Sequence, residues 1–240
     1  MHATPDAHDA HLDTRDSAPT SPAPRLPAAV LWDMDGTIVD SEPYWMAAER
    51  ELVQSAGGTW TDEQATQLVG NPLEVSAQII LDRTPVTGTP AQVVDMLQSR
   101  VEEAMRSRMP WRPGARELLT ELGRLGVPCA LVTMSYASLA EVLRDALPDG
   151  TFATIVTGDI VEHGKPHPEP YLTAAERLGV DPGECVALED SPTGAGSAVA
   201  AGVPTIGIPH IVEIPELVGL TLVPTLDGVR AADLLEIVRR

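Results

Sequence analysis

The stretch AAVLWDMDGTIVDSE, residues Ala28 to Glu42, holds an apolar run that ends abruptly in two aspartates one residue apart. A strand with one face in water alternates polar and apolar residues, and a strand buried on both faces excludes carboxylates, because an unpaired buried charge is costly. Asp33 and Asp35 at the mouth of a buried strand therefore indicate a chemical site, provided that the rest of the chain supplies partners. An Asp-rich turn at the end of a strand is the plainer alternative.

Composition narrows the class of partner. The 240 residues carry a formal net charge of −19, and we therefore expect neither nucleic acid nor an anionic membrane as a partner, because both require a basic patch. No apolar segment approaches the roughly 18 residues of a membrane span. Cys129 and Cys185 each lie inside an apolar run and are expected to be free, buried thiols in a reducing compartment. We expect a cytoplasmic protein that is a monomer or a small homo-oligomer.

Short continuous apolar runs recur after residue 27 and predict a parallel sheet covered on both faces. Helix-like segments separate these runs, and such alternation is typical of a doubly wound, Rossmann-like α/β fold. The runs are AAVLW before Asp33, CALV before Thr133, ATIV before Thr157, CVAL before Glu189 and VPTIGI before Pro209, with a weaker LTLV before Pro224. The helical segments are expected at 114–125, 137–147, 168–178, 193–201 and 229–240.

Residues 41–111 interrupt this alternation, because they contain no good strand and only amphipathic helical patterns, near 44–56, 62–68, 73–81 and 90–105. Prolines punctuate both ends of the segment. We predict a small α-helical cap domain at 41–111, inserted into an α/β core made of 28–40 and 112–240. Residues 1–27, rich in Pro, Ala, Asp, Ser and Thr, are predicted to form a disordered tail.

Polar groups gather where the predicted strands end, and ligands of open α/β sheets bind beyond the carboxyl ends of the strands. Two carboxylates about 4 Å apart repel by about 4 kcal/mol at an effective dielectric constant of about 20, so such a cluster must take up protons or bind a divalent cation. An oxygen-only ligand set favours Mg²⁺, which together with a lysine would attract a phosphate to this acidic chain. The converging residues are Asp33, Asp35, Thr133, Ser135, Lys165, Glu189 and Asp190.

The motifs DMDGT, a threonine at the end of a strand, GKPHP and LEDS follow one another in this order, and in them the chain resembles the haloacid dehalogenase superfamily. More narrowly, it resembles the phosphatases and β-phosphoglucomutase-like members that carry a helical cap after the first motif. The resemblance covers about residues 28–225. It implies a Mg²⁺-dependent phosphatase that hydrolyses a small phosphorylated metabolite through an aspartyl-phosphate intermediate.

The resemblance also implies a role for each motif. Asp33 would be the nucleophile that attacks phosphorus, and Asp35 the general acid that later acts as the base. Thr133 and Lys165 would hold the phosphoryl oxygens. The expected metal-binding residues are Asp33, Asp35 through its backbone carbonyl, Asp190 and Glu189, the last as a ligand or as a partner beside the ligands.

Two positions depart from the family pattern. Met134 stands where a polar residue is common, although its backbone N–H could still donate to the phosphate. Glu169 stands where the lysine motif usually continues with Asp, which suits the positive end of the helix that follows. Each motif also has a plainer interpretation, with Lys165 as a surface lysine and the carboxylates of LEDS as caps of the next helix.

Three polar residues near the lysine motif have no firm role. His163 and His167 flank Lys165 but lack the partner pattern of a metal site, so we expect them on the loop surface. Asp159 fits either a partner of the site or a plain loop residue.

The cap is expected to select the substrate, although its residues are harder to interpret. Tyr44 and Trp45 begin its first helix and could equally pack its interior. The candidate substrate-binding residues are Ser135, Met134, Glu42, Tyr44, Trp45 and Asn71.

The cap also bears on the reaction. In the β-phosphoglucomutase-like pattern, a His of the first cap helix and an Arg of a later cap loop serve the mutase, whereas the corresponding positions here hold Trp45 and Leu73. We therefore favour a phosphatase, with a β-phosphoglucomutase-like phosphosugar mutase as the alternative. A dehalogenase would not need Asp35, and a non-catalytic binding protein would be expected to have lost one of the motif residues.

Overall fold

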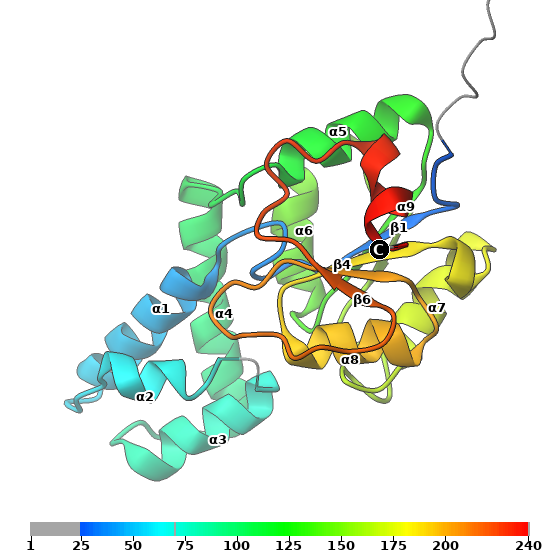
Figure 1. Cartoon of the computed structure of the whole chain (residues 1–240). Helices are drawn as coiled ribbons and strands as arrows, with labels where there is room; N and C mark the ends of the chain where they lie inside the picture. Colours follow the sequence, from blue (N-terminus) through cyan, green and yellow to red (C-terminus); the bar gives the residue numbers. More distant parts are fainter. Residues whose placement is uncertain (1–24, 70, 240) are drawn as a thin grey trace, which may run out of the picture.

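The computed structural model describes residues 25–69 and 71–239, and its centre is a six-stranded sheet between two layers of helices (Figure 1). The strand order is β3-β2-β1-β4-β5-β6, and every adjacent pair is parallel. The predicted doubly wound α/β class is confirmed, and the weak LTLV run forms the outermost strand β6. The prediction for the tail lies outside the described residues over 1–24. The strands are β1 (Val30–Trp32), β2 (Cys129–Val132), β3 (Thr154–Val156), β4 (Val186–Glu189), β5 (Thr205–Gly207) and β6 (Leu220–Leu222).

Strand β1 is buried on both faces, which explains why its sequence is apolar without alternation. Val30 and Trp32 belong to the hydrophobic cluster on the α5 and α6 side of the sheet, and Leu31 belongs to the cluster on the α7 side. Successive side chains of a strand point to opposite faces, so this apolar run contributes residues to the hydrophobic clusters on both faces of the sheet. The core helices are α5 (Ala115–Leu125), α6 (Ala137–Asp145), α7 (Glu169–Leu178), α8 (Pro192–Ala200) and α9 (Leu234–Ile237), with 3₁₀ turns η1 (Pro182–Glu184) and η2 (Ala231–Asp233).

The strand order reverses direction between β1 and β4. From β1 the chain proceeds to β2 and β3 on one side, whereas β4, β5 and β6 lie on the other side. Crevices form at the carboxyl ends of strands where the order reverses. Asp33 directly follows β1 and Glu189 is the last residue of β4, so both carboxylates lie at this point.

Four helices between β1 and α5 form the helical cap of the predicted fold class, a group set to one side of the sheet in Figure 1. Helices α1 and α3 both pack on α4. Two of the helices begin with a capping box, in which Thr61 and Thr89 each accept from the backbone N–H three residues later. The cap helices are α1 (Glu42–Ser55), α2 (Asp62–Thr66), α3 (Leu73–Arg83) and α4 (Pro90–Ser107).

The end of the chain differs from the expectation. A helix over 229–240 was predicted from the pattern, but the described residues form only η2 followed by the short helix α9. The turn begins at Arg230, whose backbone N–H donates to Asp233 at 3.0 Å. Ala231, Leu234 and Ile237 are buried there, so the apolar spacing reflects a buried face, but the helical structure that carries it spans only residues 231–237.

Two expectations from composition can be compared with the structure. Cys129 and Cys185 are free and buried, as predicted. Across residues 25–69 and 71–239, every helix is too short or too polar to cross a membrane.

Candidate active site

Asp33 occupies the exit of β1, and its backbone N–H donates to the carbonyl oxygen of Leu188 at 3.0 Å, which ties it to β4. The residue is only 7% exposed. One carboxylate oxygen, Oδ1, accepts from Nζ of Lys165 at 2.7 Å. The other, Oδ2, is buried and has no hydrogen-bond partner among the described residues. A buried carboxylate oxygen without a partner is costly, so this atom indicates a ligand or a reaction partner.

Lys165 lies in the loop before α7, and its buried ammonium group contacts three oxygens. Nζ donates to Asp33 Oδ1 at 2.7 Å, to Glu189 Oε1 at 2.6 Å and to the backbone oxygen of Val132 at 2.8 Å. Burial alone would lower the pKa of Lys165, but Asp33 and Glu189 outweigh it and raise this pKa above its ordinary value. The lysine is therefore a fixed positive charge of the site and is not a surface residue.

Glu189 is fully buried at the end of β4, where the side chains of Lys165 and Tyr171 donate hydrogen bonds to its carboxylate. The same oxygen that accepts from Lys165 also accepts from the hydroxyl of Tyr171 at 2.6 Å. Gly194 allows this arrangement, since a Cβ there would lie 2.0 Å from the Glu189 carboxylate oxygens. Burial raises the pKa of Glu189 to about 7, against the lowering effect of Lys165.

Asp190, the next residue, lies against the backbone of the first motif. A Cβ on Gly36 would lie 1.9 Å from Asp190 Oδ2, and Gly36 has a φ of +87°, which also favours glycine. Burial, then Asp33 and Glu189, raise the pKa of Asp190 well above its ordinary value. Asp33, Glu189 and Asp190 each place a carboxylate oxygen within 4.8 Å of the others, an oxygen-only cluster of the kind that holds a divalent cation.

Asp35 lies beside this cluster among hydroxyl groups. Its Oδ2 accepts from Ser135 at 2.7 Å and from Thr133 at 3.3 Å, and its Oδ1 accepts from Ser41. Burial raises the pKa of Asp35, while the hydrogen bond from Ser41 opposes the shift and the charge of Asp33 adds to it. The carboxyl therefore keeps its proton to a higher pH than an ordinary aspartate does, which suits a proton donor.

The other predicted substrate-binding residues are spread out. The side chain of Met134 turns toward the lysine loop, where its sulfur accepts from the backbone N–H of Lys165 at 3.2 Å. Tyr44 donates to the backbone oxygen of Arg108 at 2.9 Å, and Trp45 is buried in the hydrophobic cluster that continues into the cap. Asn71 is exposed and donates to the backbone oxygen of Gln67 at 3.3 Å.

Of the cap candidates, Glu42 has the most direct electrostatic link to the site. Burial, then the charges of Asp35 and Glu49, raise its pKa to about 7. Glu42 is the first residue of α1, so the cap begins within reach of the motif carboxylates.

Some residues of the site were missed or left open by the sequence. Tyr171 stands in the amphipathic pattern of α7, which does not distinguish it from core packing, and Ser41 is predicted only as the first residue of the cap segment. Asp159 is exposed on the loop after β3. Ser191 caps α8 by accepting from the backbone N–H of Gly194 at 3.1 Å, which leaves the LEDS carboxylates free of that task.

The arrangement defines a class of site. A buried carboxylate with one free oxygen lies beside a fixed ammonium group, an acidic cluster suited to a cation and a second carboxyl poised to give a proton. These groups together can receive a phosphoryl group, in which three negative oxygens must be balanced by positive charge and hydrogen-bond donors.

Comparison with known proteins gives the family. The family model for haloacid dehalogenase-like hydrolases matches residues 27–202, and the chain belongs to this family. It is 31% identical over 184 residues to the phosphorylated carbohydrates phosphatase of Thermotoga maritima, covering 76% of this chain and 85% of that protein. It is 32% identical over 195 residues to hexitol phosphatase B of Escherichia coli K12, covering 78% and 85%. The expected enzyme class, a phosphoric monoester hydrolase of this family, is confirmed.

A solved structure shows the same architecture. CbbY from Rhodobacter sphaeroides, in a crystal structure with phosphate, superimposes with a TM-score of 0.78 at 27% identity, covering 87% of this chain and 99% of that one. The fold and the family are thus established independently of the side-chain geometry described above.

Proposed function

We propose that this protein is a Mg²⁺-dependent phosphatase that hydrolyses a small phosphorylated carbohydrate or polyol through an aspartyl-phosphate on Asp33. The observation that carries the proposal is the environment of Asp33, whose Oδ1 is held by Lys165 while its buried Oδ2 has no described partner. The names of the two phosphatases similar to this chain support the class of substrate.

The donor set fits Mg²⁺. Asp33 and Asp190 contribute carboxylate oxygens that lie close together, and we assign the backbone carbonyl of Asp35 as a further ligand. Glu189 belongs to the same cluster, but its Oε1 already accepts from Lys165 and Tyr171, so we assign it to positioning the lysine. When bound, Mg²⁺ supplies positive charge that offsets the repulsion among carboxylates and phosphoryl oxygens.

In the first half of the reaction, an Asp33 carboxylate oxygen attacks phosphorus and forms the new O–P bond. The bond between phosphorus and the ester oxygen breaks, and its electron pair stays on that oxygen, which takes the proton from Asp35. The positive charge of Lys165 attracts the phosphoryl oxygens, and the Thr133 hydroxyl turns from Asp35 to donate to one of them. The raised pKa of Asp35 supports this role, because the carboxyl must carry its proton when the ester oxygen leaves.

In the second half, Asp35 is ionised and takes a proton from water as that water attacks phosphorus. The bond between phosphorus and Asp33 then breaks, inorganic phosphate leaves and both carboxyl groups return to their starting states. Ser41 and Ser135 donate to the Asp35 carboxylate and so steady it while it is charged.

The cap favours hydrolysis over the alternative mutase reaction. A mutase must hold a doubly phosphorylated intermediate, which requires a second phosphate-binding cation. Four arginines of the cap helices contact other cap residues, namely Arg50 with Asp62, Arg83 with Gln67, Arg100 with Glu51 and Arg106 with Glu102, whereas Arg108, directly after α4, is exposed. Glu42, at the start of the cap, is a carboxyl group and supplies no positive charge for a second phosphate.

The proposal is tested by phosphate release from a panel of hexose, hexitol and pentose monophosphates, assayed with Mg²⁺ and with excess chelator. β-Glucose 1-phosphate is included and its conversion to glucose 6-phosphate is followed separately. We expect Mg²⁺-dependent release of phosphate from at least one sugar or polyol ester. Isomerisation without net phosphate release would overturn the proposal in favour of the mutase.

A further inference from the structure

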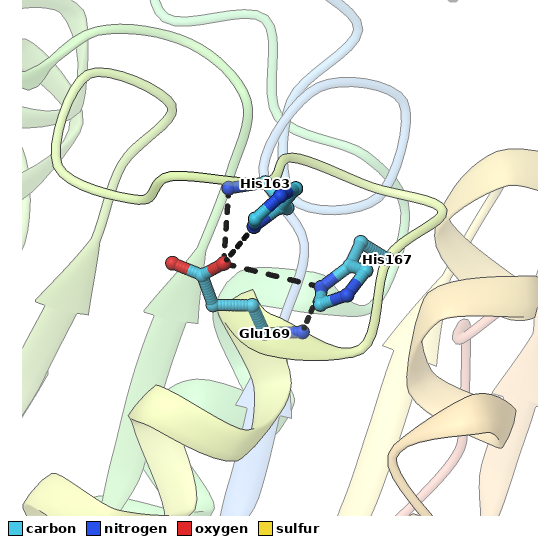
Figure 2. A group of neighbouring side chains, drawn as sticks. All are labelled: His163, His167 and Glu169. Atoms are coloured by element: carbon cyan, nitrogen blue, oxygen red, sulfur yellow. Dashed lines mark hydrogen bonds and ion pairs between the residues drawn. The ribbon is translucent and has the colours of Figure 1, made fainter.

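Two histidines bracket the lysine of the active site, and a glutamate from the start of α7 reaches both. Glu169 Oε2 lies 3.0 Å from His163 Nδ1 and 3.9 Å from His167 Nδ1 (Figure 2). The two imidazole rings are 4.6 Å apart between centroids. The imidazoles are about half exposed, at 56% and 51%, and the Glu169 side chain is 27% exposed, so an ion from solvent can reach them. The proposed phosphatase reaction uses none of these three side chains.

The hydrogen bonds of the cluster fix the tautomer of His167 and the orientation of the Glu169 carboxylate. The backbone N–H of Glu169 donates to His167 Nδ1 at 3.2 Å, so that nitrogen carries no proton, and its lone pair becomes available to a cation once this hydrogen bond is released. The backbone N–H groups of Glu162 and His163 donate to the Glu169 carboxylate at 2.7 and 2.9 Å, which fixes its orientation. Two imidazole nitrogens and an oriented carboxylate oxygen therefore lie within 4.8 Å of one another, close enough for one ion to reach all three.

We propose that His163, His167 and Glu169 form a second metal site, distinct from the Mg²⁺ site and selective for Zn²⁺ or a similar divalent transition metal. In a tetrahedral zinc site with ligand distances of about 2.0–2.1 Å, neighbouring ligand atoms are about 3.4 Å apart. The separations of 3.0 and 3.9 Å around Glu169 Oε2 bracket this value. Coordination requires side-chain rotations that release the hydrogen bond to His167 Nδ1 and bring the three atoms to similar separations.

The ligand chemistry separates the two sites. The cluster at Asp33 and Asp190 offers only oxygen, which suits Mg²⁺, whereas two imidazoles favour Zn²⁺, Co²⁺, Ni²⁺ or Cu²⁺. Binding requires His163 Nδ1 to be unprotonated, and any proton it carries leaves to the solvent. Metal binding also breaks no ion pair between Glu169 and a lysine or arginine. Among the ion pairs of the described residues, the partners of this carboxylate are His163 and His167.

The proposed zinc site lies next to the lysine of the active site, so metal binding there should affect the loop that carries this lysine. Lys165 lies midway between His163 and His167, so an ion bound by both joins the two sides of the segment that carries the lysine. Metal binding is therefore expected to slow amide hydrogen exchange over residues 162–168. If the cluster served only to hold the loop through the Glu169 carboxylate, the same segment would be protected without added metal.

The experiment is calorimetric titration of Zn²⁺ into the full chain at neutral pH with the catalytic site saturated by Mg²⁺. Three other histidines, His2, His8 and His11, could also bind zinc, so the reference protein carries alanine at those positions. His210→Ala is the matched control, because His210 is a partly buried histidine paired with Asp40, far along the chain from the cluster. Co²⁺ absorption in the visible range gives a second readout, since it reports nitrogen ligation directly.

We expect one Zn²⁺ per chain in the reference protein and in His210→Ala. His163→Ala and His167→Ala should each weaken binding by about tenfold or more, and Glu169→Gln should do the same. The histidines are exposed, so both alanine variants should keep the circular dichroism of the wild type. Unchanged zinc affinity in both His variants would overturn the proposal. Loss of binding on removing His2, His8 and His11 would overturn it as well, because the zinc would then belong to those residues.

Discussion

The hydroxyl of Tyr171 donates a 2.6 Å hydrogen bond to Oε1 of Glu189, the oxygen that also accepts from Lys165. A residue in the first turn of α7 thereby fixes the carboxylate that orients the lysine, and the lysine in turn orients Asp33. Both Tyr171 and Glu189 are fully buried, so this chain of contacts is shielded from water. The active site therefore depends on a helix that touches none of the reacting atoms.

Replacing Tyr171 with Phe should keep the ring packing and remove only the hydroxyl. A buried carboxylate that loses a hydrogen bond costs about 1.5–3 kcal/mol, so the free energy of unfolding should fall by that amount. The turnover number should fall about tenfold with little change in KM, because Lys165 becomes less well held. Denaturant unfolding and steady-state kinetics measure both effects. An unchanged turnover number would show that Tyr171 has no part in orienting the lysine.

Glycine in α8 gives a test with a built-in control. A Cβ at position 194 would lie 2.0 Å from the Glu189 carboxylate, whereas a Cβ at position 196 comes no closer than 3.9 Å to its nearest neighbour. Gly194→Ala should destabilise the fold by about 1–3 kcal/mol through overpacking and reduce activity, while Gly196→Ala should be neutral or stabilising by about 0.5–1 kcal/mol. The melting temperatures and turnover numbers of the two variants test this prediction. Equal behaviour of the pair would mean that Glu189 is not held as described.

A buried glutamate in the cap should make stability depend on pH. Burial raises the pKa of Glu49 to about 7, although its carboxylate accepts from Trp60 Nε1 at 3.0 Å. A carboxyl whose pKa is raised by folding contributes stability below its unfolded value of about 4.5 and loses that contribution as the pH rises through about 7. Glu49→Gln should therefore be more stable than the wild type by about 2–3 kcal/mol at pH 8, and similar to it near pH 5.

Melts at these two pH values test the prediction for Glu49. Glu51→Gln is the control, because Glu51 lies on the same helix with an exposed side chain. Its melting temperature should follow the wild type at both pH values. A Glu49→Gln protein with the wild-type pH dependence would contradict the assigned shift.

Metal removal should also change stability. Asp33, Glu189 and Asp190 bring their carboxylate oxygens within 4.8 Å of one another, and repulsion among them disfavours the metal-free fold. Mg²⁺ at about a hundredfold excess over its dissociation constant should stabilise the fold by about 2.7 kcal/mol. In Asp190→Asn the metal-free protein should melt at a higher temperature than the metal-free wild type, and the effect of Mg²⁺ should shrink. Wild-type melts that superimpose with and without Mg²⁺ would rule out the assigned metal site.

The sequence was sufficient for the fold class, and it predicts a group of polar residues at the ends of the strands. Continuous apolar runs identify the strands, and the rule that ligands bind beyond their carboxyl ends predicts Asp33, Lys165 and Asp190 at one edge of the sheet. The structure places those three residues together. The order of the strands could not be predicted from the sequence. Every residue of β1 and β4 is buried, so their side chains do not indicate which strands lie beside them or in which register.

What could not be predicted depends on side-chain direction across distant elements. Tyr171 and Glu189 are 18 positions apart, and the periodicity of α7 gave no sign that the tyrosine hydroxyl would reach β4. His163 and His167 were expected on the loop surface, and they are exposed, but their approach to Glu169 depends on how the loop folds back onto α7. The predicted last helix is too long. Apolar spacing gives the buried face of a helix but not its ends, and here the hydrogen bond from Arg230 to Asp233 begins a short turn.

The most direct test of the account is to find the phosphoryl group on Asp33. Wild-type protein turning over its best substrate is quenched in acid and digested, and the peptide containing Asp33 is examined by mass spectrometry. The account predicts a phosphorylated peptide that requires both substrate and Mg²⁺ and is absent in Asp33→Asn, which should release no phosphate. Rapid phosphate release by Asp33→Asn, or turnover by the wild type with no phosphoryl group on this peptide at any quench time, would contradict it.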